Sequence, residues 1–294
     1  MAVRALVDDR LRRAGWLAFA AAVLTVGLVS YGGWVRVSGS GLGCPDWPLC
    51  EGAVVPELDG ATAIEFGHRL FAGVTMLTVG AAAWFAWLGR RVDVVAARLV
   101  LAAFAAILFQ AALGGATVLT DLHGMVRLAH LATAMATLGL LTAGAVRALG
   151  VPPSPSPRVR TVSVLLVGAG LVVLAGGAVL GAGVSAECPG LPLCDERSAA
   201  GAAWLHGLHR LAGAALLAGL VWSTLELRRR RGTRLAIGFN HAAAFFVAVQ
   251  VLVGVWAVAQ GLPPALRILH LSLATVVWWA VVGQWALAAT ARRR

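Results

Sequence analysis

The sequence predicts an all-α integral membrane protein whose eight transmembrane helices form two tandem four-helix bundles, related by a pseudo-twofold axis. Three observations support this fold class. Hydrophobic residues make up 60% of the 294 residues and charged residues only 13%, which is far from the composition of a soluble domain. The apolar residues are gathered into long runs, and the two halves of the chain repeat the same motifs at nearly constant spacing.

The apolar runs predict where the helices lie. A bilayer core of about 30 Å requires about 20 apolar residues per helix. Eight runs meet this requirement, near residues 15–37, 64–88, 97–119, 125–147, 161–183, 203–226, 235–259 and 268–290. The first run lacks a small-residue cleavage site followed by a soluble domain, so we expect it to be a helix and not a removed signal peptide.

The distribution of charge predicts the orientation of these helices. All 24 basic residues are arginine, and 18 of them precede the first run, follow the last, or lie in or beside the loops after the second, fourth and sixth. The positive-inside rule therefore predicts cytoplasmic termini in a multi-pass protein of the inner (plasma) membrane. The opposite, outer face carries 9 of the 13 acidic residues and both cysteine loops. The net charge of +11 thus reflects membrane topology, and no nucleic-acid-binding module is indicated.

Repeated motifs divide the chain into two halves. Two of them recur after 144 residues and two after 140: Gly32-Gly33 as Gly176-Gly177, the pair Cys44 and Cys50 as Cys188 and Cys194, Gln110 as Gln250, and 126–131 as 266–271. Because each unit has an even number of helices, both units have the same orientation, and their axis runs along the membrane normal. We expect an N-terminal bundle at 1–150, a cytoplasmic Pro-rich linker at 151–160 and a C-terminal bundle at 161–294.

Four histidines occupy duplicated positions near the outer ends of helices. His68 and His130 are expected to face each other in the first half, and His209 and His270 in the second. Two histidines at equal depth on facing helices suit bis-histidine ligation of a haem iron. A lone intramembrane histidine is more often an interhelical hydrogen-bond donor, but four at repeated positions favour a metal or haem. Zinc is disfavoured because no acid or thiol completes a tetrahedral set at that depth.

Glu65 is the main break in the repeat. It lies three residues before His68, on the same helical face, whereas its counterpart in the second half is His206. A carboxylate near the membrane boundary can simply be solvated. Beside a haem edge it would be a base or proton acceptor, and the two halves would then have different tasks.

Four arginines accompany the histidines on the same helices, namely Arg69, Arg127, Arg210 and Arg267. A guanidinium near the interface can bind the propionate carboxylates of a haem. The alternative is that each arginine reaches toward the lipid headgroups. His123, two turns outward from His130 on roughly the same face, either stands over the outer mouth of the N-terminal pocket or is a solvated loop residue.

The cysteines form two close pairs, Cys44 with Cys50 and Cys188 with Cys194, in loops predicted on the outer face. Five residues separate the members of each pair, so neither is a CxxC redox motif. In an oxidising compartment both pairs are expected to form disulfides. For the second pair a structural staple is favoured. For the first pair a redox role stays open, because small exposed disulfides can be labile.

Taken together, these features resemble the haem A synthase family, in its bacterial type with cysteine pairs. The resemblance rests on eight helices in two halves, Glu65-x-x-His68-Arg69, His209-Arg210, the histidines at 130 and 270, and the cysteine pairs. It implies a membrane haem-dependent oxidoreductase acting on a CH group, which oxidises the C8 methyl of haem O to the formyl of haem A for cytochrome c oxidase, with oxygen from water.

The resemblance also implies a role for each half. The N-terminal half would bind substrate haem O between His68 and His130, with Glu65 as the catalytic residue, and the C-terminal half would hold haem b between His209 and His270. His123 is the alternative to His130, which we prefer because only His130 has a repeat partner, His270. Haem O synthase would be a transient partner, the lipid bilayer would surround the protein, and an acceptor such as a quinone would take the electrons.

Two other functions compete with this prediction. A b-type di-haem electron-transfer protein would need symmetric halves, which Glu65 opposite His206 argues against. A quinone-linked thiol oxidoreductase would use the outer cysteines and would need no histidine pairs in the membrane. A transporter is disfavoured because the discontinuous helices usual in transporters are not evident.

Overall fold

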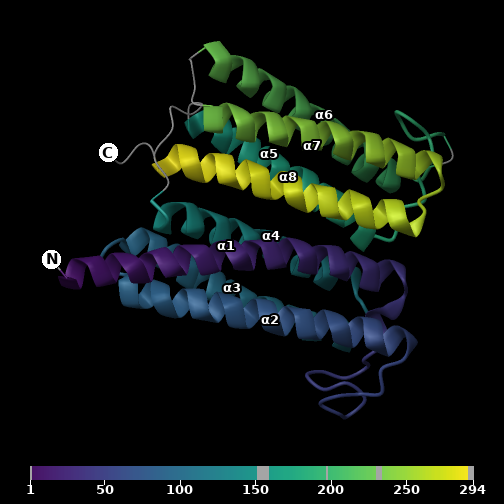
Figure 1. The fold of residues 1–294 in the computed structure, drawn as a ribbon. Coiled ribbons are helices and arrows are strands. Elements are labelled where there is room, and N and C mark those ends of the chain that lie inside the picture. Colours follow the sequence, from purple (N-terminus) through teal and green to yellow (C-terminus); the bar gives the residue numbers. More distant parts are fainter. Residues whose placement is uncertain (1, 151–158, 197, 230–233, 291–294) are drawn as a thin grey trace.

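The computed structural model describes residues 2–150, 159–196, 198–229 and 234–290. These residues form eight long α-helices and one short 3₁₀ helix (Figure 1): α1 (Ala2–Val37), η1 (Ser40–Leu42), α2 (Gly60–Gly89), α3 (Val94–Leu119), α4 (Gly124–Ala148), α5 (Val159–Gly181), α6 (Ala200–Arg229), α7 (Arg234–Ala259) and α8 (Pro264–Thr290). Each long helix contains a segment long and apolar enough to cross a membrane. The predicted all-α membrane fold with eight spans is therefore confirmed. The predicted linker at 151–160 lies outside the described residues except for its last two positions.

The helices pack as two rings of four. In the first ring α1 packs on α2, α2 on α3, α3 on α4, and α4 returns to α1; α5 to α8 repeat this order. The rings meet where α8 packs on both α1 and α4, and where α5 packs on α4. Exchanging α1 with α5 and α4 with α8 reproduces the main helix pairs within and between the rings, as a twofold relation requires, and among the described long helices only a minor contact of α1 with α3 lacks a matching counterpart. Figure 1 shows the two sets of helices one above the other.

The interface between the rings is closely packed. A Cβ atom added to Gly124, the first residue of α4, would overlap the carbonyl oxygen of Gly181 at the end of α5. The two backbones can approach this closely only because both positions are glycine. Further along, the indole Nε1 of Trp278 on α8 donates a 2.8 Å hydrogen bond to the carbonyl of Met135 on α4. Residues of the two halves are thus held at fixed positions relative to each other.

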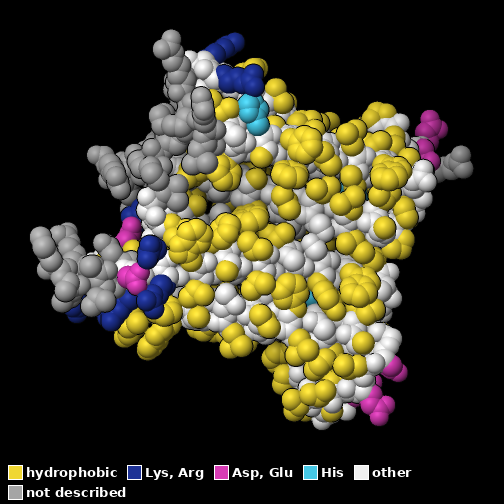
Figure 2. Space-filling model, viewed as in Figure 1, with side chains coloured by type: hydrophobic (Ala, Val, Ile, Leu, Met, Phe, Trp, Pro, Cys, Tyr) yellow, Lys and Arg dark blue, Asp and Glu magenta, His cyan; other side chains and the backbone are white. Residues whose placement is uncertain are grey.

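Polar groups separate to the two ends of the helices. In Figure 1, α1 begins and α8 ends at one end of the molecule, and the loops between α1 and α2 and between α5 and α6 lie at the other. Figure 2 shows hydrophobic side chains over the middle of the visible face, arginines together with a few acidic side chains toward the first end, and acidic side chains without arginines at the second. This multi-pass membrane protein therefore has the charge asymmetry that the sequence indicated, and its sidedness stays a prediction.

Asp93 stabilises the end of the helices where α1 begins. Its Oδ1 accepts hydrogen bonds from the backbone of Val95 (2.9 Å) and Ala96 (3.0 Å), which caps α3. Its other oxygen, Oδ2, lies 2.8 Å from Nε of Arg147 near the end of α4. Partial burial pushes the pKa of Asp93 upward, but the hydrogen bonds from Arg147, Ala96 and Val95 and the charge of Arg147 together outweigh it and hold this pKa below its usual value.

Replacing Asp93 with asparagine is expected to lower the free energy of unfolding by about 1 to 2 kcal/mol at neutral pH. Because the folded-state pKa is depressed, the ionised carboxylate contributes stability above its unfolded pKa, and this contribution is lost as pH falls through the folded value. Thermal unfolding in detergent at neutral and acidic pH measures both effects. Asp121→Asn, in an exposed loop, is the control; equal unfolding temperatures for the two variants would contradict the assignment.

Candidate functional site

A cavity lies inside the first ring of helices and reaches the interface between the rings. Its volume is about 500 Å³, within the range typical of cofactor and substrate pockets. Most of its lining comes from α1, α2, α3 and α4, with Gly177, Leu180 and Gly181 from α5 and Leu271 from α8. The lining is largely apolar, and the polar exceptions include several of the residues that the sequence singled out.

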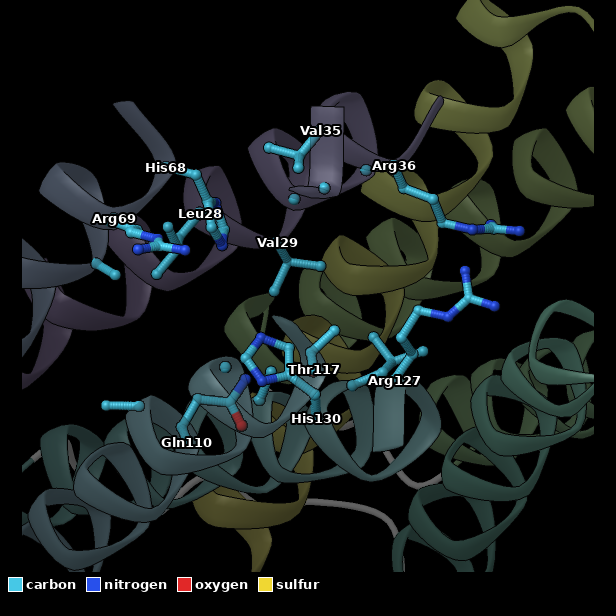
Figure 3. Close-up of a pocket in the computed structure, with 18 of the residues that line it drawn as sticks. Leu28, Val29, Val35, Arg36, His68, Arg69, Gln110, Thr117, Arg127 and His130 are labelled. Atoms are coloured by element: carbon cyan, nitrogen blue, oxygen red, sulfur yellow. The ribbon is translucent and has the colours of Figure 1, made fainter. Parts of the chain in front are cut away.

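His68 and His130 approach this cavity from opposite sides. Figure 3 shows their rings directed into the space between α2 and α4. The Nδ1 atoms of both rings are buried and make no hydrogen bond within the described residues. Tyr31 of α1 stacks on the ring of His68, with ring centroids 5.8 Å apart. Two buried imidazoles that face an apolar cavity suit a planar ligand whose metal binds nitrogen from both sides.

His209 and His270 meet in the second ring of helices. Their ring centroids are 6.2 Å apart and the ring planes are inclined by 70°. Two imidazoles that bind one metal ion from opposite sides, each at about 2 Å, place their centroids about 6 Å apart. Nδ1 of His209 donates a 3.1 Å hydrogen bond to the carbonyl of Val172, which leaves Nε2 free as a ligand. The spacing of the pair therefore suits two nitrogen ligands of one metal ion.

Each of the four histidine rings rests on a glycine of the preceding helix. A Cβ added to these glycines would lie 2.8 to 3.4 Å from the Cε1 atom of the ring: Gly32 against His68, Gly114 against His130, Gly176 against His209 and Gly254 against His270. A larger residue would push the ring out of place. The repeat of Gly32 and Gly176 is evident in the sequence without indicating this role, and the 140-residue spacing of Gly114 and Gly254 is a further sequence signal for the same contact.

Replacing Gly176 with alanine is expected to displace the ring of His209, because the new Cβ would lie 2.8 Å from its Cε1 atom. Overpacking of this kind costs about 1 to 3 kcal/mol, so we expect weaker metal or haem retention in the second ring. Haem content after purification measures this. Gly213→Ala is the matched control, since nothing lies within 4 Å of its added Cβ, and equal haem content in the two variants would contradict the prediction.

Glu65 lies on the cavity wall, one turn from His68. Only 8% of its side chain is exposed, and its Oε1 accepts a 3.2 Å hydrogen bond from Nε of Arg69. This ion pair stabilises the carboxylate in apolar surroundings and leaves Oε2 available to another group. In the second half, His206 is buried, and its Nε2 donates a 2.9 Å hydrogen bond to the carbonyl of Val184. The two positions thus differ in chemistry and in what they contact.

Arg69 also holds the first disulfide loop, residues 44–50. Its two terminal nitrogens donate to three loop carbonyls, those of Asp46 (2.9 Å), Leu49 (2.7 Å) and Cys44 (3.0 Å). This loop in turn covers the cavity, because Trp47 packs on Gly115 of α3 and lines the cavity wall. One guanidinium therefore joins the carboxylate of Glu65 to the loop that closes the site.

Arg210 makes the same arrangement with the second disulfide loop, residues 188–194. It donates to the carbonyls of Gly190 (2.7 Å), Pro192 (2.9 Å) and Cys188 (3.0 Å). Both arginines were predicted to bind propionates, and their terminal nitrogens are engaged by loop carbonyls in this structure. Arg127 and Arg267, the other two predicted propionate residues, make no side-chain hydrogen bond or ion pair in the described parts of the chain, so they are the freer pair for a carboxylate.

Both predicted disulfides are present. Cys44 is bonded to Cys50 and Cys188 to Cys194, each with an S–S distance of 1.97 Å, which confirms the pairing. None of these four cysteines lines the cavity. Each disulfide closes the loop that an arginine holds, and so it acts on the site through the loop backbone.

The exposure of the first disulfide differs from the expectation. A redox role was left open for this pair because small exposed disulfides can be labile, but Cys44 and Cys50 are both buried. The reason is that Trp47, inside the same loop, packs against α3 and draws the loop onto the helices. In the second pair Cys188 is buried and Cys194 is partly exposed. The premise of exposure was therefore wrong for the first pair, and its redox role stays an untested prediction.

His123, the alternative ligand, lies away from the cavity. It is exposed at the position just before α4, and it is not among the residues that line the cavity. This position supports the choice of His130 as the partner of His68. Within the described residues, no three His, Cys, Asp or Glu side chains converge as a metal site, so the histidines are grouped as pairs.

Comparison with known proteins gives consistent matches over most of the chain. The family described as "Cytochrome oxidase assembly protein" matches residues 15–282. A protein named heme A synthase from Symbiobacterium thermophilum is 32% identical over 270 residues, covering 85% of this chain and 87% of that protein. A second heme A synthase, from Exiguobacterium sp. strain ATCC BAA-1283 / AT1b, is 30% identical and covers 88% and 89%. A third, from Exiguobacterium sibiricum, is 28% identical and covers 83% and 84%.

Proposed function

Because this chain belongs to the haem A synthase family of membrane proteins, and so to the enzymes of haem A biosynthesis, we propose that it oxidises the C8 methyl of haem O to a formyl group. The observation that carries this proposal is the asymmetry of the two halves. A buried carboxylate, Glu65, lies beside the histidine pair that lines the open cavity. The second histidine pair has His206 in its place.

The proposed reaction takes oxygen from water. Methyl and water give hydroxymethyl with loss of two electrons and two protons, and hydroxymethyl and a second water give a geminal diol with loss of two more of each. The diol then releases water to leave the formyl group. The four electrons go to an acceptor outside the substrate, which we assign to a two-electron carrier of the membrane such as a quinone.

The histidine pairs have separate tasks in this proposal. His68 and His130 hold the substrate haem in the cavity, where the largely apolar walls orient the macrocycle. His209 and His270 hold haem b. The 6.2 Å spacing of the two imidazole rings supports their binding to one iron. When bound, haem b supplies electron transfer between the substrate pocket and the acceptor. Residues 1–150 are thus the substrate half and residues 161–294 the haem b half.

Glu65 is the proposed base. Its Oε1 is held by Arg69, so Oε2 is free to take a proton from water or from a hydroxylated intermediate. Arg69 is fixed by three carbonyls of the first disulfide loop, and this loop also covers the cavity through Trp47. The disulfide loop therefore orients the base and limits the entry of bulk water. Arg69 acts here as a positioning residue.

The proposed cellular setting rests on the distribution of the arginines and on the two disulfides. We place both termini in the cytoplasm and both disulfide loops outside an inner (plasma) membrane, where an oxidising compartment maintains the cysteine pairs. Haem O is membrane-soluble, so we expect transient contact with the haem O synthase that supplies it.

The pigments bound to the purified protein test this function. We expect haem b together with haem O or haem A, identified by chromatography of the extracted haems, and conversion of added haem O to haem A with a quinone as acceptor. A protein that retains two haems of type b and never modifies haem O would instead be a di-haem electron-transfer protein. Absence of any haem absorption would favour a thiol oxidoreductase.

A further inference from the structure

Three arginines from three different helices meet at the interface between the rings, at the end of the molecule where the disulfide loops lie. Arg36 is in the last turn of α1, and Arg127 and Arg267 are in the first turns of α4 and α8. Arg36 and Arg127 line the same cavity, and Arg267 lies in the first turn of α8, the helix that packs on both α1 and α4. Figure 3 shows the guanidinium groups of Arg36 and Arg127 side by side at one end of the cavity, with His68 and His130 farther in.

This cluster has no counter-charge within the described residues. None of the three side chains forms an ion pair or a hydrogen bond there, and Nε of Arg127 is buried without a partner. Other arginines of the helices are paired, for example Arg147 with Asp93. Three like charges close together and partly buried repel one another, so this arrangement favours an anionic ligand.

The cluster is also asymmetric with respect to the repeat. Arg127 and Arg267 are counterparts, 140 residues apart, whereas the position 144 residues after Arg36 is Leu180. Arg36, Arg127 and Leu180 line the cavity of the first ring. The extra positive charge therefore belongs to the pocket proposed for substrate. Arg267 comes from α8, the helix that also carries His270.

Resting on the proposed function, we propose that Arg36, Arg127 and Arg267 form one carboxylate-binding site, shared by both halves, that takes a propionate of the haem in the first cavity. The two histidines hold the centre of the macrocycle, and the arginines hold its acidic edge. Guanidinium groups suit this task because they donate paired hydrogen bonds to a carboxylate. Arg36 then makes the substrate pocket prefer a haem whose propionate groups are ionised.

Binding of protohaem IX and of its dimethyl ester tests this site, because the ester lacks the carboxylates and keeps the macrocycle. Each is titrated into the purified haem b-containing protein and followed by absorption. We expect wild-type protein to bind the free acid about 10-fold or more tightly than the ester. Arg36→Leu, which copies Leu180, is expected to lose this preference while its affinity for the ester stays unchanged.

A control and two outcomes complete the test. Arg90→Leu removes an exposed charge that lies over Trp87 at the other end of α2, and we expect it to keep the wild-type preference. Equal acid-to-ester ratios in Arg36→Leu and wild type would overturn the proposal. Reduced binding of phosphatidylglycerol vesicles by Arg36→Leu, with that ratio unchanged, would assign the cluster to lipid phosphate and also overturn it.

The result is independent of the proposed reaction. If the protein converts haem O but binds the acid and the ester equally, the carboxylate site is refuted and the proposed function stands. If the protein prefers the free acid but never converts haem O, the carboxylate site stands and the proposed reaction is refuted.

Discussion

Replacing Glu65 with glutamine is expected to lower the rate of haem A formation by about 100-fold or more, with haem binding retained. Glutamine keeps the size of the side chain and can still accept a hydrogen bond from Arg69, but it cannot take a proton, and loss of a general base typically costs 10²- to 10⁴-fold. The extracted haems, separated by chromatography, give the ratio of haem A to haem O directly.

The control for this variant lies in the loop that precedes α2. Glu57→Gln changes an exposed carboxylate, and we expect it to form haem A at the wild-type rate. Undiminished haem A formation by Glu65→Gln would refute the catalytic assignment. Loss of haem from Glu65→Gln would instead show that the carboxylate acts on binding. Accumulation of a hydroxylated haem would place Glu65 in the second oxidation.

Replacing His209 with alanine is expected to remove the resident haem and to stop turnover. The ring of His209 lies 6.2 Å from that of His270, and alanine would leave one proposed ligand without its partner. We expect the affinity for haem b to fall by more than about 100-fold, since the loss of outer-shell partners alone costs 10- to 100-fold. The pyridine haemochrome spectrum of purified protein gives the number of haems per chain.

Two further variants isolate the role of this pair. His206→Ala, one turn earlier on α6, is expected to keep haem b, because that ring contacts the carbonyl of Val184. His68→Ala is expected to keep haem b and to lose binding of the substrate haem. If His209→Ala retained a full complement of haem b, or if His68→Ala lost it, the assignment of the two halves would be wrong.

Much of the site was predictable because it depends on residue identity at fixed spacing. His68 and Glu65 stand out because histidine and carboxylate are costly in lipid, and the repeat identifies the histidine partners without any structure. The roles of the arginines were less accessible. Arg69 hydrogen-bonds to carbonyls 20 to 25 residues away, and sequence spacing carries no information about contacts with loop backbone.

For the cysteines, too, the sequence predicted one property, the pairing, and the tertiary structure decided another, the burial. The close spacing of Cys44 with Cys50 and of Cys188 with Cys194 predicted both disulfides, because a short loop keeps two thiols within bonding reach. Spacing did not predict that Cys50 is buried and Cys194 partly exposed. Burial of each sulfur depends on how its loop packs on the helices, which is a tertiary property.

Other contacts depend on helix rotation, which an apolar sequence encodes weakly. Where both the lipid face and the packed face of a helix are apolar, periodicity does not show which residues turn inward. Asn240 illustrates this, because it is fully buried and bonds to Ser223 and to Gln284 on neighbouring helices. The glycines behind the histidines are a second case, since their role depends on the ring that packs against them.

The sequence by itself determined the eight spans, the repeat, the four histidines and the asymmetry at Glu65, because run length, spacing and the cost of polar groups in lipid are local properties. The tertiary structure decided that Arg69 joins Glu65 to the disulfide loop and that the helices carrying Arg36, Arg127 and Arg267 come together at the interface. The physical reason is that the depth and rotation of each helix are set by packing against the others, and these decide which charges come together.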